Sequence, residues 1–171
     1  NRLSVFASAA NTDRDSYYGP GNDPLKAYGK TTDLTAMGGA QYVHTFDKCF
    51  FMPSDLTAGL EYNRDRLKDN MWGYNRHTDQ TVNIYSAFLQ NEWKNDRWGI
   101  LIGGRLDKHN MVDNVIFSPR ANLRFNPTQN INLRLSYSSG FRAPQAFDED
   151  MHIENVGGTV AMIERAKDLK E

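Results

Sequence analysis

The chain lacks the long apolar run that a membrane-spanning helix requires. Such a helix takes about 20 consecutive apolar residues, and no stretch of this sequence comes near that length, so a helical membrane protein is excluded. Mean hydropathy is low, at −0.67. That value does not separate a soluble sheet protein from a membrane β-barrel, because only every second residue of a barrel strand faces lipid.

The chain also has only one cysteine and a net charge close to zero. Cys49 is the single cysteine, which rules out an internal disulfide framework and leaves the redox compartment open. The formal net charge is −1 and the lysines and arginines form no basic block, so nucleic acid is disfavoured as a partner. The chain has no nucleophile elbow, phosphate loop or zinc-binding helix, and we expect it not to be an enzyme.

What the chain does contain is an alternation of apolar and polar residues. Residues 131–142 show the period of a strand with one oily and one wet face. The oily face holds Ile131, Leu133, Leu135, Tyr137 and Phe141, and the wet face holds Asn132, Arg134, Ser136, Ser138 and Arg142. The preceding strand repeats the pattern, with Phe117, Ala121, Leu123 and Phe125 opposite Ser118, Arg120, Asn122 and Arg124. Arginines on the wet face of two consecutive strands are typical of a membrane barrel with a polar lumen.

Short and long connections alternate between the expected strands. Strands are predicted at about 2–12, 31–46, 55–66, 80–93, 98–106 and 131–142, and a sixth strand in chain order ends at about 125. The short connections are 47–54, 94–97 and 126–130, and the long ones are 13–30, 67–79, 107–114 and 144–171. This asymmetry predicts an all-β fold, an antiparallel up-and-down transmembrane β-barrel of which the chain supplies about seven strands, with the long loops outside the cell.

Aromatic and charged residues fit the same interpretation. Aromatic rings lie near the short turns, as an interfacial belt requires, although chance placement of rings in strands remains an alternative: Tyr42, Phe46, Trp93, Trp98 and Phe125. A charge at mid-depth on the lipid side would cost about 2 to 4 kcal/mol, so charges are expected inside. The residues predicted to face the lumen are Glu61, Glu92, Arg105, Arg120, Arg134 and Arg142.

The last two strands resemble the barrel of TonB-dependent outer-membrane receptors. The resemblance lies in Ser118-Pro119-Arg120, in the turn Phe125-Asn126-Pro127-Thr128, in Arg134-Leu135-Ser136-Tyr137 and in Phe141-Arg142-Ala143-Pro144. Within that family the chain is most similar to the cobalamin and ferric-siderophore receptor group. The family usually continues to a leucine-lysine-proline-glutamate sequence, whereas this chain has Leu169-Lys170-Glu171 without the proline.

The resemblance implies a barrel of about 22 strands filled by an N-terminal plug domain. Residues 1–171 would then be a fragment of that barrel without the plug, and 144–171 would be an outer loop segment. It also implies a place in the bacterial cell outer membrane and uptake of cobalamin or an iron chelate. TonB would supply the energy, the lumen-facing residues would contact the plug or hydrate the wall, and a surface lipoprotein is a further candidate partner.

The long loops carry flat rings and hydrogen-bond donors suited to a corrin, a catecholate siderophore or a sugar. These candidate ligand-binding residues are Tyr17, Tyr18, Tyr28, Trp72, Tyr74, Arg76, His77 and Phe147. The same rings would also suit an outer aromatic belt. We expect no cofactor, with calcium as the exception: Asp148, Asp150 and Glu154 are weak candidate ligands, although a solvated acidic loop explains them better.

Two alternatives to a TonB-dependent transporter remain open at this point. One is a soluble β-rich module that binds a small ligand, such as a sandwich or a calycin-like domain, whose oily residues would form a protein core. The other is a passive porin, which would have no plug. Detergent extraction with the outer membrane separates the first alternative, and a plug in the upstream sequence separates the second.

Overall fold

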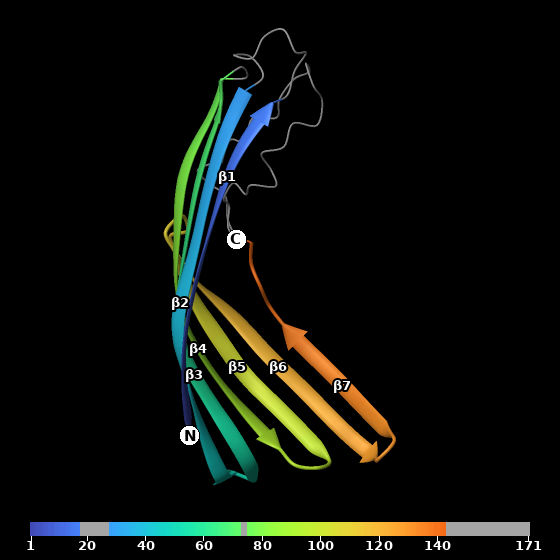
Figure 1. The fold of residues 1–171 in the computed structure, drawn as a ribbon. Coiled ribbons are helices and arrows are strands. Elements are labelled where there is room, and N and C mark those ends of the chain that lie inside the picture. The colour runs from blue at the N-terminus through green and yellow to red at the C-terminus, as the bar shows by residue number, and fades with distance from the viewer. Residues whose placement is uncertain (18–27, 73–74, 143–171) are drawn as a thin grey trace. The chain divides into compact units, whose positions relative to one another are not determined.

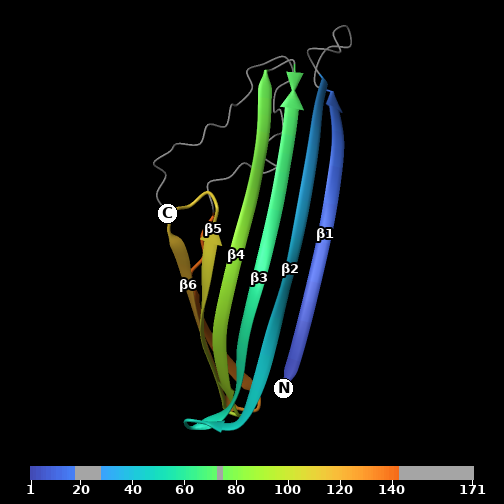
Figure 2. The same ribbon diagram turned by 90° about the vertical axis from the view of Figure 1, so that its left-hand side faces the viewer.

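The computed structural model describes residues 1–17, 28–72 and 75–142, and these form one antiparallel sheet of seven strands. The strands are β1 (Arg2–Tyr17), β2 (Tyr28–Cys49), β3 (Met52–Met71), β4 (Arg76–Lys94), β5 (Trp98–His109), β6 (Val115–Thr128) and β7 (Ile131–Ser138). Each strand lies beside its neighbour in sequence (Figure 1). The predicted all-β, up-and-down architecture is confirmed, and β1 to β4 can be followed in order in Figure 2.

The chain divides into two compact units. The larger unit holds residues 1–7, 38–62 and 84–142, and the described residues of the smaller unit are 8–17, 28–37, 63–72 and 75–83. Strands β1 to β4 contribute residues to both units, whereas β5, β6 and β7 lie entirely in the larger one.

The register of the larger unit fixes which side chains share a face. Arg105 of β5 lies opposite Phe88 of β4 and Ser118 of β6. Arg124 of β6 lies opposite Arg134 of β7. Because side chains alternate along each strand, these pairs define one face from β4 to β7, and the residues between them define the other.

Two prolines in β6 shape its pairing with β7. Pro127 coincides with the register shift between Phe125 and Thr128, as expected because proline cannot donate to the ladder. Pro119 accepts a hydrogen bond from the Ser139 N–H at 3.1 Å but has no N–H to return one. This explains why β7 ends at Ser138 and not at 142, as the sequence pattern had predicted.

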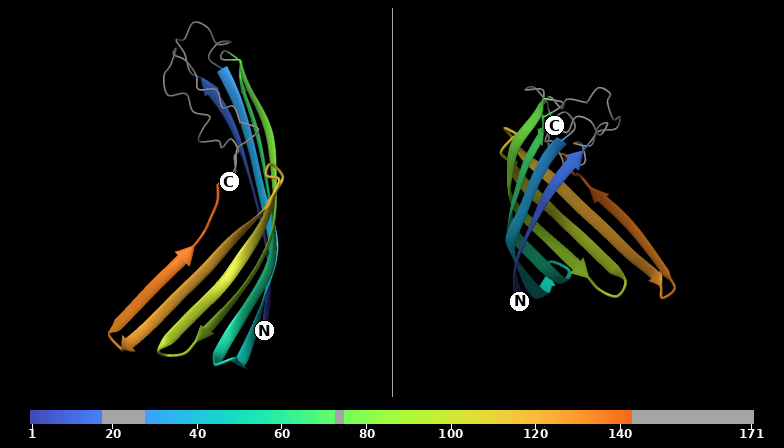
Figure 3. Two further views of the ribbon diagram at one scale, coloured as in Figure 1. Left: turned by 180° about the vertical axis from the view of Figure 1, so that it is seen from behind. Right: turned by 45° about the horizontal axis from the view of Figure 1, so that its top comes forward.

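Three short turns, all in the larger unit, lie at the same end of the sheet (Figure 3). In the β4–β5 turn the Asn95 Oδ1 atom accepts hydrogen bonds from the backbone N–H groups of Arg97 and Trp98, at 2.9 and 2.7 Å. In the β2–β3 turn Phe50 adopts a left-handed backbone with φ of 62°. The predicted succession of tight turns is therefore confirmed, although each turn is shorter than expected because the flanking strands continue further.

Strands β1, β3 and β4 extend further into the smaller unit than predicted. The sequence pattern predicted a loop over 67–79, but β3 continues to Met71 and β4 begins at Arg76. Likewise, β1 continues to Tyr17, inside the loop predicted over 13–30. The reason is that polar side chains bond across the strands here, so pairing continues without an oily face: the Thr31 hydroxyl donates to the Asp69 carboxylate at 2.7 Å.

Few apolar side chains are buried in the part of the chain that the structure describes. The smaller unit buries Leu67, Met71 and Val82, and the larger unit buries Ile116. No helix among the described residues is long and apolar enough to cross a membrane.

Candidate functional site

One face of the larger unit is polar from β4 to β7. On β4 it presents Ser86, Gln90 and Glu92, which lie opposite Asp107, Gly103 and Leu101 of β5. On β6 and β7 it presents Ser118, Arg120, Asn122, Arg124, Arg134, Ser136 and Ser138. The alternation read from the sequence is therefore the alternation of the sheet. We call this face the polar wall.

Arg105 is the centre of a hydrogen-bonded cluster on the polar wall. Its guanidinium donates to Glu61 of β3 at 2.9 Å, to Asp107 at 2.8 Å and to the Ser86 hydroxyl at 2.8 Å. The Ser86 hydroxyl in turn donates to Asp107. Ser86 and Asp107 are buried, so the guanidinium neutralises a carboxylate that water does not reach. This cluster joins β3, β4 and β5.

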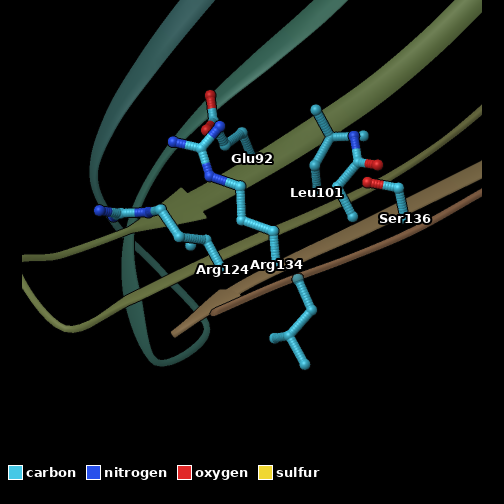
Figure 4. A pocket seen from close by; sticks show the side chains of 8 residues that line it. Glu92, Leu101, Arg124, Arg134 and Ser136 are labelled. Carbon is cyan, nitrogen blue, oxygen red and sulfur yellow. The ribbon is translucent and has the colours of Figure 1, made fainter. Parts of the chain in front are cut away.

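A second group of side chains lines a shallow hollow of about 320 Å³ on the polar wall (Figure 4). Arg124 and Arg134 lie directly opposite each other on β6 and β7, and Glu92 lines the same hollow. Arg124 donates to the backbone carbonyls of Asn95 and Trp98, and Arg134 donates to the Asn132 side chain. The acceptors of both guanidinium groups are thus uncharged.

A neighbouring hollow of about 420 Å³ contains three of the predicted lumen residues, Glu61, Arg105 and Arg120. The alternation in the sequence predicted one wet face with Glu61, Glu92, Arg105, Arg120 and Arg134, and the two hollows bring these five residues together in two groups. Arg142 follows the end of β7 and is exposed. Their predicted contact with a plug stays a prediction.

The opposite face of the larger unit is apolar and exposed to its surroundings. Leu60, Leu89, Ile102 and Leu135 are between 56 % and 69 % exposed, whereas Asp107 is 4 % exposed. A water-soluble sheet would bury such leucines against a second layer. Here Ser86 and Asp107 of the polar wall are buried and the large apolar side chains of the opposite face are not, which is the arrangement of a wall with lipid outside.

Aromatic rings gather near the short turns on and beside this apolar face. Trp98 stacks on Phe125 with ring centroids 4.1 Å apart. Trp93 lies against Phe50 and Phe51, at 6.4 and 5.7 Å, and its indole N–H donates to the Cys49 carbonyl at 3.0 Å. The predicted rings of this end therefore form clusters, which the two phenylalanines of the β2–β3 turn extend.

The smaller unit holds the described part of the predicted ligand-binding group. Tyr28 and Trp72 stack with centroids 5.2 Å apart and planes 4° apart, and both rings are exposed. The Tyr28 hydroxyl donates to Asp15 at 2.8 Å, and this hydrogen bond to a carboxylate raises the pKa of Tyr28 above 10.0. Tyr17 is also exposed.

Arg76, another predicted ligand-binding residue, is not exposed as the Tyr28 and Trp72 rings are. It is buried, and its Nε atom donates to Asp69 at 2.9 Å, while Asp69 also accepts from Thr31. His77 is exposed and its Nδ1 atom lies 3.0 Å from the Asn70 side-chain oxygen. The Asp69 cluster was missed in the sequence because residues 67–79 had been assigned to a loop.

Some predicted site residues lie outside the described part of the chain. They are the ring residues Tyr18, Tyr74 and Phe147, the calcium candidates Asp148, Asp150 and Glu154, and the whole segment 144–171. Within residues 1–17, 28–72 and 75–142, no group of histidine, cysteine, aspartate or glutamate side chains is placed to hold a metal ion.

Comparison with known proteins decides what kind of sheet this is. The family model described as TonB dependent receptor-like, beta-barrel matches residues 2–170. The chain belongs to this family. No curated protein and no solved structure matches it. As a TonB-dependent receptor barrel it is part of a receptor and transporter of the bacterial outer membrane, not an enzyme.

The family assignment agrees with the exposed apolar face and the buried Asp107 of the larger unit. The oily face, predicted from the alternation of residues 117–137, belongs against outer-membrane lipid, and the polar wall belongs to the lumen side. A plug domain and TonB are the partners that the family implies. The alternative of a soluble ligand-binding module is excluded by the family, since its members are outer-membrane receptors.

Proposed function

We propose that residues 1–171 are part of a longer receptor that imports a scarce large ligand, cobalamin or a ferric siderophore, with energy supplied through TonB. The family assignment carries the transport class. The exposed Tyr28–Trp72 pair supports a ligand with a flat or apolar surface, because such a ligand can stack on a ring face. In the same proposal 144–171 is an outer loop segment, and a surface lipoprotein is a further partner.

The polar wall would face the plug of that receptor. Glu61 and Arg105 already bind each other, so they contribute to a neutral wall more than to a charged contact. Glu92, Arg120, Arg134 and Arg142 complete the set proposed to lie toward the plug. Calcium held by Asp148, Asp150 and Glu154 remains part of the proposal as a loop-ordering ion.

Ligand-dependent growth tests the proposed function. The full-length receptor is returned to a strain that lacks it, and growth is measured with cobalamin, a ferric siderophore or haem as the limiting nutrient. We expect growth to depend on the receptor with cobalamin or the siderophore. Dependence on haem alone, or on none of the three, would contradict the proposed ligand class.

A pair of variants tests the aromatic site itself. In Trp72→Ala the ligand loses one ring contact of about 1 kcal/mol, so the Kd of the identified ligand should rise about fivefold. Phe51→Ala is the matched control, because Phe51 is also an exposed ring, at the β2–β3 turn of the larger unit. Equal Kd values for Trp72→Ala and the wild type would remove the Tyr28–Trp72 pair from the binding site.

The passive porin is separated by the energy requirement. A passive pore lets its solute through in a strain that lacks TonB, whereas an energised receptor binds the ligand there but does not accumulate it. We expect binding without uptake in the TonB-deficient strain, measured with radiolabelled ligand.

A further inference from the structure

Strands β6 and β7 carry positive charge without any negative charge. Between Val115 and Ser138 there are three arginines, Arg120, Arg124 and Arg134, and no aspartate or glutamate. All three belong to the polar wall, as the register of β5, β6 and β7 requires. The polar wall beside them is different, since Arg105 is neutralised there by Glu61 and Asp107.

The two arginines that face each other are held in place by uncharged groups. Like charges directly opposite on neighbouring strands destabilise a sheet, and Arg124 and Arg134 are such a pair. Arg124 nevertheless keeps a defined position, because it lies over Gly99, where a Cβ atom would come within 3.0 Å of its Nε atom. The carbonyls of Asn95 and Trp98 fix its Nη2 atom.

None of the three arginines forms an ion pair with any described residue. Arg134 has the Asn132 side chain as its acceptor, and Arg120, which is exposed, makes no hydrogen bond within the described residues. Glu92 lines the same hollow as Arg124 and Arg134 but lies beyond ion-pair distance of both. Among the described residues, the β6–β7 part of the polar wall is therefore a group of three cations without matching carboxylates, in which uncharged acceptors hold Arg124 and Arg134.

We propose that Arg120, Arg124 and Arg134 together bind an acidic polypeptide segment that lies against the polar wall. Arg120 and Arg124 are four residues apart on one strand, which is about 13 Å at roughly 3.3 Å per residue. A single small anion cannot contact both positions, whereas an extended segment with two spaced carboxylates can. An anion placed between Arg124 and Arg134 also removes their mutual repulsion and gains charge-assisted hydrogen bonds.

The proposal assigns this segment to the plug domain of the same receptor and therefore rests on the proposed function. The polar wall faces the lumen, and the plug is the partner that the family places there. The structure adds which part of the wall is docked and the charge that the docked segment must have.

Zero-length cross-linking in the membrane-embedded, full-length receptor tests the proposal. In the separate variants Arg120→Lys and Arg134→Lys the positive charge is kept and an amine is introduced. A carbodiimide joins an amine to a carboxylate that is in direct contact with it, and mass spectrometry identifies the joined peptides. Arg97→Lys is the matched control, because Arg97 is an exposed arginine on the β4–β5 turn, outside the polar wall.

We expect both wall variants, and not the control, to be joined to aspartate or glutamate residues of one plug segment. The yield should fall several-fold in high salt, since screening weakens ion pairs. Cross-links to Glu92 alone, to a separate polypeptide, or to nothing would each overturn the proposal. Those results would leave the proposed function intact, because ligand-dependent growth and outer-membrane localisation are measured independently in the same strains.

Discussion

At the scale of single residues, Arg105 shows how a charged lumen wall is made stable. One guanidinium serves Glu61, Ser86 and Asp107 at once, so the buried Asp107 carboxylate is paired and β3, β4 and β5 are joined. A hydrogen bond to a charged group is worth more than a neutral one, and leaving its buried partner unsatisfied is the larger cost.

Arg105→Met should therefore destabilise the barrel. We expect a loss of about 2 kcal/mol in the free energy of unfolding, because Asp107 stays buried without its cation. Urea unfolding of the full-length receptor in phospholipid vesicles, followed by tryptophan fluorescence, measures the loss. Lys94→Ala is the comparison: it removes the more exposed ion pair with Asp55 and should cost less than about 1 kcal/mol. Equal losses in the two variants would contradict the special role of Arg105.

Tyr28 gives a prediction about pH. It is the first residue of β2 and follows the long 18–27 connection. Because β2 has 22 residues and a barrel strand needs only about 9 to 11 to cross the bilayer, we place this end of β2, and with it Tyr28, outside the membrane. The Tyr28 phenol donates to Asp15 only while the phenol is protonated. Since the pKa of Tyr28 is raised, this hydrogen bond is complete below pH 10.0 and is lost as the pH rises through the raised pKa.

The Tyr28 titration is measured as the difference in absorbance at the phenolate band between the wild type and Tyr28→Phe. We expect Asp15→Asn to move the Tyr28 pKa down toward its ordinary value, because the carboxylate acceptor is gone. No difference between wild type and Asp15→Asn would show that the hydrogen bond has no effect in solution.

At the scale of elements, β5 allows the two faces to be compared in neighbouring positions. Ile102 is exposed on the apolar face, and Leu101 lies on the polar wall opposite Glu92. Ile102→Lys should cost about 2 to 4 kcal/mol in unfolding free energy in vesicles, the range for a charge in mid-bilayer. Leu101→Lys should cost much less, since Glu92 can pair with the new amine. Equal costs would mean that the two positions meet the same environment.

The sequence predicted this facing well because a strand has a period of two and the alternation near residues 98–107 and 117–137 is nearly unbroken. It failed at the strand ends. Leu67 and Met71 are buried in β3 beside Asp69, but no oily stripe marks that segment, so it was assigned to a loop. Stabilisation there comes from bonds between strands, such as Thr31 to Asp69, and such partners are far apart in sequence.

The candidate site was predictable to a similar degree. Alternation alone identified Glu61, Arg105 and Arg134 as residues of one face. Alternation could not show that Arg105 forms an ion pair with Glu61 and that Arg134 lies opposite another arginine, because both depend on which residues face each other across neighbouring strands. Arg124 was placed on the wet face but not among the site residues, and only the register shows that it faces Arg134.

At the scale of the whole molecule, the exposed apolar face and the outer edges of β1 and β7, which pair with no further strand among the described residues, favour association of the isolated chain. We expect residues 1–171 alone to aggregate or form oligomers in plain buffer, and detergent to reduce this by covering the apolar face. Light scattering with and without detergent measures the effect. A monodisperse monomer in plain buffer would contradict the assignment of that face to lipid.

The left-handed backbone of Phe50 has a consequence for the molecule in its lipid. A bulky residue at φ of 62° carries a conformational penalty of about 1 to 3 kcal/mol, which glycine would avoid. Phenylalanine instead leaves its ring projecting beside Trp93 at the tip of the hairpin. The tip of the β2–β3 hairpin therefore carries backbone strain. We expect this tip to loosen first when the receptor is moved from lipid into water, because the Phe50 ring then loses the surrounding lipid headgroups.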